Sequence, residues 1–75
     1  MVNITFIYEN RAHKKTYKNK TPNVDEVLFD FGKLISHRIN DLLFLHKGKY
    51  LLQNDYRKIV EDIIIMVIRI NRKNF

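Results

Sequence analysis

The 75-residue sequence contains no cysteine, two glycines and a single proline. The absence of cysteine excludes a disulfide framework and a thiolate metal site, and it is typical of proteins from reducing compartments. With so little glycine and proline the chain has no flexible linker, so we predict a single domain over residues 1–75. No apolar run approaches the ~20 residues that span a bilayer, and the first residues do not resemble a signal peptide. We therefore expect an intracellular protein, cytoplasmic or nuclear, that does not enter a membrane.

Positive charge is in excess, because 14 Lys and Arg oppose 8 Asp and Glu for a formal net charge of +6. Much of it is concentrated in residues 11–20. Such a cluster suits an acidic protein partner or nucleic acid, but lysines on an edge strand can also serve only to prevent unwanted sheet pairing. No interleaved aromatic signature accompanies the lysines, so nucleic acid is the less favoured partner. The residues assigned to these contacts are Arg11, Lys14, Lys15 and Lys18.

Hydrophobic periodicity predicts the order strand, strand, helix, strand, short strand, strand. The strands are expected at residues 2–9, 13–18, 41–46, 50–52 and 63–69, with turns at 10–12 and 47–49. A helix of three turns is expected to begin after Asn23, whose side chain suits the N-cap position, and to fray or end near Gly32, because glycine costs about 1 kcal/mol relative to alanine within a helix. The order indicates an α+β domain with one helix laid across a mixed sheet. Its expected core residues are Val2, Ile4, Phe6 and Tyr8, with Val24, Val27, Leu28, Phe31, Leu34 and Ile35 on the helix.

This order and several local strings resemble those of ubiquitin-like proteins. Residues 43–51 (Leu-Phe-Leu-His-Lys-Gly-Lys-Tyr-Leu) are similar to the family's third strand and its turn, and residues 23–27 to its capped helix start. Asp55-Tyr56 is similar to a pair near the family's last loop, and residues 64–70 to its closing strand. The resemblance implies a ubiquitin-like β-grasp, with one helix across a mixed sheet of four to five strands. Residues 71–75 carry no Gly-Gly, so the resemblance implies that this protein is not conjugated to others.

The last predicted strand is apolar on both faces, because alternate residues point to opposite sides of a strand. We assign Ile64, Met66 and Ile68 to the core. A short domain has few elements to cover the opposite face, so we predict that a protein partner or a second copy covers it. The alternative is that Leu52 or Phe75 folds over this face. The resemblance implies binding positions at Leu45, Ile65 and Val67, strand parity adds Leu43 and Ile63, and a basic rim is expected from Lys47, Lys49 and Arg69.

No catalytic or metal-binding constellation is evident. The histidines are not at metal-ligand spacing from one another, and the only serine, Ser36, has no nearby base pattern to activate it. We therefore predict a protein that is not an enzyme and that uses no cofactor, metal or small-molecule substrate. The favoured function is a protein-protein interaction module acting through its sheet face. The alternatives are an obligate subunit or homodimer that buries the same face, and a nucleic-acid-binding domain that uses residues 11–20.

Overall fold

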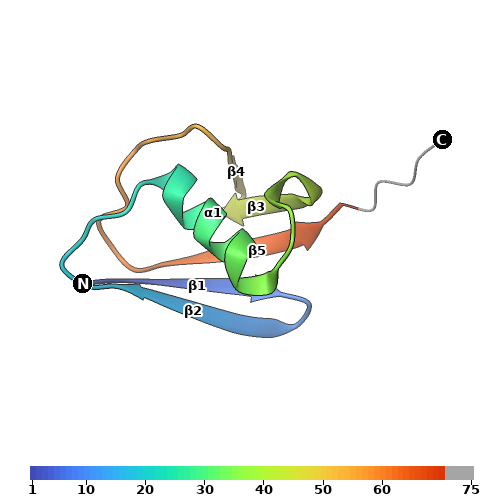
Figure 1. The fold of residues 1–75 in the computed structure, drawn as a ribbon, viewed down its shortest axis with the longest axis horizontal. Coiled ribbons are helices and arrows are strands. Elements are labelled where there is room, and N and C mark those ends of the chain that lie inside the picture. Colours follow the sequence, from blue (N-terminus) through green and yellow to red (C-terminus); the bar gives the residue numbers. More distant parts are fainter. Residues whose placement is uncertain (71–75) are drawn as a thin grey trace.

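In the computed structural model, which describes residues 1–70, one helix crosses one face of a five-stranded sheet (Figure 1). The spatial order of the strands is β2-β1-β5-β3-β4, with β5 parallel to β1 and the other neighbours antiparallel. This confirms the predicted α+β class and the order of elements. The elements are β1 (Val2–Tyr8), β2 (Arg11–Tyr17), α1 (Val24–Ile35), a 3-10 turn η1 (Ile39–Asp41), β3 (Leu42–His46), β4 (Lys49–Leu51) and β5 (Ile63–Arg69).

Both hairpins close through two residues with positive φ. Glu9 and Asn10, at φ 50° and 62°, join β1 to β2, so the turn lies earlier than predicted and β2 begins at Arg11. Lys47 and Gly48, at φ 52° and 79°, join β3 to β4. Two consecutive positive-φ residues give the hairpin twist that matches the right-handed twist of the strands.

Helix α1 begins at the predicted cap. The side-chain oxygen of Asn23 accepts a hydrogen bond from the backbone N–H of Glu26 at 2.8 Å, which satisfies one of the free amides of the first turn. Two further amides of this end donate to the loop that precedes β5, from Val24 to the carbonyl of Arg57 at 3.0 Å and from Asp25 to that of Asp55 at 2.9 Å. The loop is therefore held against the helix start.

The helix has the expected three turns, but it neither frays nor ends at Gly32, which is buried within it. A Cβ at this position would lie 2.5 Å from Cγ2 of Ile39 and 3.1 Å from the carbonyl oxygen of His37. The helix ends instead at Ile35, where Ser36 adopts the left-handed conformation and the N–H of His37 donates to the carbonyl of Gly32 at 2.9 Å. Glycine is thus needed at position 32 to let the returning chain pack closely.

The core lies between α1 and the sheet and is centred on Phe31. Its ring stacks on Phe6 with centroids 4.3 Å apart and meets Tyr8 and Phe44 edge-on at 5.8 and 6.0 Å. Leu34 was expected in this core but is 54% exposed. Its neighbour Ile35, about 100° away around the helix, packs against the core instead. The buried apolar residues are Val2, Ile4, Phe6, Tyr8, Tyr17, Val24, Val27, Leu28, Phe31, Leu42, Phe44, Ile59, Ile65 and Val67.

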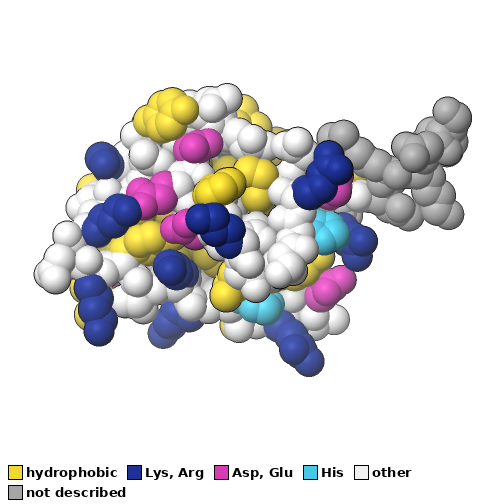
Figure 2. Space-filling model, in the orientation of Figure 1, with side chains coloured by type: hydrophobic (Ala, Val, Ile, Leu, Met, Phe, Trp, Pro, Cys, Tyr) yellow, Lys and Arg dark blue, Asp and Glu magenta, His cyan; other side chains and the backbone are white. Residues whose placement is uncertain are grey.

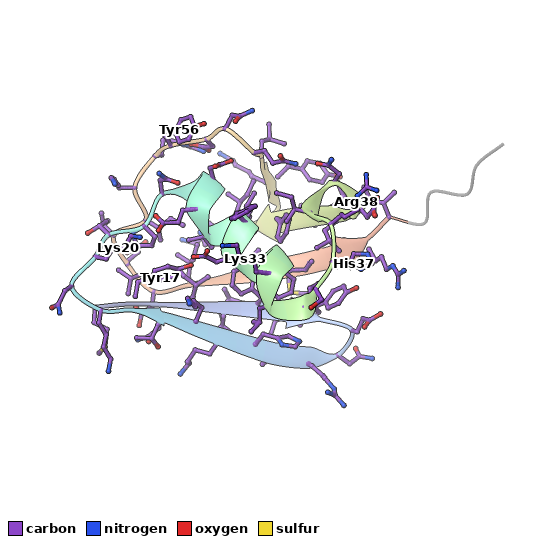
Figure 3. The ribbon with its side chains drawn as sticks, viewed as in Figure 1. Tyr17, Lys20, Lys33, His37, Arg38 and Tyr56 are labelled. Carbon is purple, nitrogen blue, oxygen red and sulfur yellow. The ribbon has the colours of Figure 1, made fainter. Side chains whose placement is uncertain are left out.

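Strand β2 is tied to the helix by Tyr17, whose hydroxyl donates to a carboxylate oxygen of Asp30 at 2.7 Å (Figure 3). Lys20, in the segment between β2 and α1, forms an ion pair with Glu26. Burial, and then the adjacent Asp30 carboxylate, raise the pKa of Tyr17 well above its ordinary value of 10.0. The phenol therefore stays protonated in the folded protein under conditions where an exposed tyrosine would ionise.

This shift predicts a loss of stability in alkali. The folded pKa of Tyr17 exceeds the unfolded one, so its contribution is complete below pH 10 and declines as the unfolded chain loses the proton at higher pH. We expect the melting temperature of wild type to fall more steeply above about pH 10 than that of Tyr17→Phe. Because all other titrating groups are shared, thermal melts of the two proteins across this range isolate the effect. Parallel pH profiles would contradict it.

Candidate functional site

The two faces of β5 are assigned the opposite way from the sequence prediction. Ile65 and Val67 point toward α1 and are 0% and 6% exposed, and Ile63 packs partly buried against the core. The assignment of Ile63, Ile65 and Val67 to a binding face is therefore wrong. The exposed fractions of Ile64, Met66 and Ile68, which were expected in the core, are 60%, 49% and 49%.

The reason lies in the pairing of β5 with its neighbours. Ile65 lies opposite Phe6 of β1, and Val67 lies opposite Phe44 of β3. Directly paired residues point to the same side of a sheet, and both phenylalanines pack on Phe31 of the helix. The core aromatics of the neighbouring strands thus set which face of β5 is buried.

The exposed side of the sheet carries a continuous apolar surface. Leu43 and Leu45 alternate with the buried residues of β3. They lie opposite Ile68 and Met66, so they are on the outer side of the sheet, where they were predicted. The surface continues onto β4 at Tyr50, which is paired with Leu45 and is 59% exposed. We call its central part the outer apolar face, formed by Leu43, Leu45, Ile64, Met66 and Ile68.

A groove of about 530 Å³ with a mixed apolar and charged lining borders this face where β5 begins. Ile64 lines it together with Lys14 of β2 and Lys47 of the β3-β4 turn. The Asp62 carboxylate in the groove accepts hydrogen bonds from the backbone N–H of Asn3 at 2.8 Å and from its side-chain amide at 3.3 Å. These bonds, the backbone one foremost, lower the pKa of Asp62. Apolar contacts and both signs of charge therefore adjoin one another here.

The predicted basic rim is only partly found at this place. Lys47 lies beside the outer apolar face through the groove. Lys49 lies on β4 opposite His46 and shares the parity of Leu51, which packs against the core, so the assignment of Lys49 to the outer rim is wrong. Arg69 shares the parity of Ile65 and Val67, so its backbone position belongs to the inner side of the sheet and its assignment to the outer rim is wrong. The alternating strand separates Arg69 from the surface that it was expected to flank.

The basic residues of β2 do not form one patch. Lys14 lines the groove of the outer side, whereas Arg11 lines a pocket near the end of α1. The ammonium of Lys15 lies 5.7 Å from the ring centre of Tyr17, and Lys18 is exposed beyond the end of the strand. Arg11, Lys14 and Lys15 lie on β2, which is an edge strand of the sheet. Lysine on an edge strand discourages pairing with other chains. The contact of these basic residues with nucleic acid or with an acidic protein stays a prediction.

Neither a metal site nor a membrane-spanning helix is found in residues 1–70. Within this range no three side chains among His, Asp and Glu converge to form a metal site. No helix in the described chain has the length and apolar character needed to cross a bilayer. Leu52 was the alternative candidate to fold over the sheet face, but its side chain is 67% exposed and does not cover it. Phe75 and the tail lacking Gly-Gly lie outside the described residues.

No family model and no curated protein matches the sequence. Solved structures do match it. The ubiquitin-like domain of an Arabidopsis thaliana protein is 20% identical with a TM-score of 0.72, over 99% of this chain and 84% of that one. A designed protein based on human erythrocytic ubiquitin is 17% identical with a TM-score of 0.70, over 99% and 95% of the two chains. This chain therefore has a ubiquitin-like β-grasp fold, as its sequence resemblance implied.

A third similar structure is that of ATBAG1 in complex with HSP70. The identity is 12% and the TM-score 0.73, over 95% of this chain. The match spans only 41% of that chain, so the likeness concerns one domain of it. At these sequence identities the matches establish the fold of this chain. They do not identify its binding surface.

Proposed function

We propose that this protein is a protein-protein interaction module that binds its partner through the outer apolar face. The observation that carries the proposal is the exposure of Ile64, Met66 and Ile68 on one side of a central strand, beside Leu43 and Leu45. A contiguous apolar patch of this kind on a small domain is typical of an interface. The ATBAG1 complex supports a protein as the class of partner, because that related fold occurs together with another protein.

The energetics agree with a binding role. Burying one such aliphatic side chain contributes about 1.5–3 kcal/mol, so a partner that covers several of them can offset the cost of association. Lys14 and Lys47 border the face beside the carboxylates of Glu61 and Asp62, which favours a partner whose apolar segment is flanked by charges of both signs. We infer binding rather than catalysis as the role of this surface.

The second candidate is self-association through the same face, as an obligate subunit or homodimer. The exposure of Met66 and its neighbours supports it equally, because a second copy would bring a matching apolar surface. Nucleic-acid binding is less favoured, since the basic side chains of β2 are divided between two sides of the sheet.

The test is Met66→Asp, which places a charge in the centre of the outer apolar face. We expect loss of partner capture, or conversion of a wild-type dimer to a monomer in light scattering, with an unchanged circular-dichroism spectrum. The matched control is Leu34→Asp on α1, because Leu34 is 54% exposed and Met66 49%, on opposite sides of the sheet. A monomeric wild type whose partner binding survives Met66→Asp would overturn the proposal.

A further inference from the structure

The inner side of the sheet extends past the end of α1, and there its side chains change from apolar to basic. Along β5 the inner positions are Ile65, Val67 and then Arg69. In the β1-β2 hairpin, inner positions are His13, opposite the buried Phe6, and Arg11 at the tip. The helix stops at Ile35, so within residues 1–70 no helix covers this end of the sheet.

These residues surround a pocket of about 480 Å³. His37, on the segment that follows α1, closes it from the helix side, and Figure 3 shows this residue beside the helix end. Figure 2 shows histidine, basic and acidic side chains gathered at this end of the molecule. We call the site the basic pocket; its polar lining includes Arg11, His13, His37 and Arg69, with the carboxylate of Glu9.

The basic pocket has donors that the described chain does not use. Among residues 1–70 the ion pairs join Lys20 to Glu26 and Arg57 to Asp55, so neither Arg11 nor Arg69 is neutralised there. Nε2 of His37 is buried and meets no hydrogen-bond partner within the same residues. A buried polar atom without a partner is unfavourable, so a turn of the His37 ring that brings Nε2 to an acceptor in the pocket would be favoured.

The donors are also held in place. The backbone N–H of His37 is bonded to the carbonyl of Gly32 at 2.9 Å, which anchors the residue to the last turn of α1. The ring of His13 packs edge-on against Phe31 at 5.8 Å. Arg11 and Arg69 lie at the ends of hydrogen-bonded strands. The backbone and the His13 ring are thus preorganised, so an anion has to order only the exposed side chains of Arg11 and Arg69.

We propose that the basic pocket binds a phosphate group. A phosphate monoester carries about −1.5 to −2 charge at pH 7 and offers three acceptor oxygens, which suits two guanidiniums and two imidazoles better than the two oxygens of a carboxylate. The volume is large enough for the group and part of the molecule that bears it. Two sources share this chemistry, a phosphorylated side chain of another protein and free inorganic phosphate. The site is opposite the outer apolar face, so the proposal does not depend on the partner of that face.

The experiment is a titration of the protein with inorganic phosphate at constant pH and ionic strength, followed through the imidazole NMR signals of His13 and His37. We expect saturable shifts with a dissociation constant of about 1 mM. Arg69→Gln and Arg11→Gln should each weaken binding about tenfold, because each removes a charge-assisted contact. Glu9→Gln should strengthen it, because a carboxylate that repels the anion is removed.

The matched control is Arg38→Gln. It removes the same charge one residue from His37, but Arg38 lines a different pocket, so phosphate should bind this variant as it binds wild type. Backbone NMR spectra verify that each variant is folded. Linear, non-saturating shifts, or equal weakening by Arg38→Gln, would mean diffuse charge attraction and would overturn the proposal. Saturable binding of a phosphoserine peptide that is tighter than that of phosphate assigns the site to a phosphorylated protein; the reverse order assigns it to free phosphate.

Discussion

Replacement of Ile65 by aspartate is expected to abolish the folded state. Ile65 is 0% exposed, lies opposite Phe6 and is part of the core beneath α1. An unpaired carboxylate there would be buried without hydrogen-bond partners, and the aliphatic contacts would be lost as well. We expect a loss above about 4 kcal/mol in the free energy of unfolding, comparable to the whole stability of a small domain. Far-UV circular dichroism and thermal melting measure it.

Ile64→Asp is the matched control for this prediction. The same substitution is made one residue away on the same strand, but Ile64 is 60% exposed on the opposite side of the sheet. The carboxylate stays in water, and we expect a change of about 1 kcal/mol, the range of strand propensities. A folded Ile65→Asp together with an unfolded Ile64→Asp would show that the two faces of β5 are reversed.

Phe31→Ala should cause the second large effect. The Phe31 ring is 1% exposed and contacts Phe6 and Tyr8 of β1, His13 of β2 and Phe44 of β3, so it joins the helix to three different strands. Its removal leaves a cavity and ends these aromatic contacts. We expect a loss of about 3–5 kcal/mol, as for other buried Phe→Ala changes, measured by urea unfolding with linear extrapolation.

Phe29→Ala provides the comparison, because it removes the same side chain two residues away. Phe29 is 52% exposed, and its ring centre is 4.7 Å from the ammonium of Lys33. Losing an exposed cation–π contact costs about 0.5–1 kcal/mol, and alanine favours the helix. Equal destabilisation by the two variants would contradict a core centred on Phe31.

Local features of this fold could be predicted because their causes are local. The alternation of Val2, Ile4 and Phe6 indicates a strand whatever its neighbours are, and Asn23 caps the helix through a bond to a residue three positions away. The fraying expected at Gly32 failed for a different reason. Helix propensity describes an isolated helix, whereas the close approach of Ile39 to Gly32 exists only in the folded chain.

The surfaces proposed to act were harder to predict. A strand with one polar face shows which side is buried, because only its apolar residues can face the core. β5 is apolar on both sides. Its alternation therefore predicts that Ile64 and Ile65 point to opposite faces of the sheet, but it does not predict which of the two faces is buried. The basic pocket has no local pattern either, since Arg11, His37 and Arg69 lie far apart along the chain.

The sequence by itself determined the order of the elements, the capped helix and the existence of two opposed apolar sets on the last strand, because these depend on residues close in the chain. Only the tertiary structure decided which set is buried. The choice depends on the pairing of Ile65 with Phe6 and of Val67 with Phe44, and on the helix that Phe6 and Phe44 both contact. Those contacts join residues from distant parts of the chain, and they leave Ile64, Met66 and Ile68 facing outward.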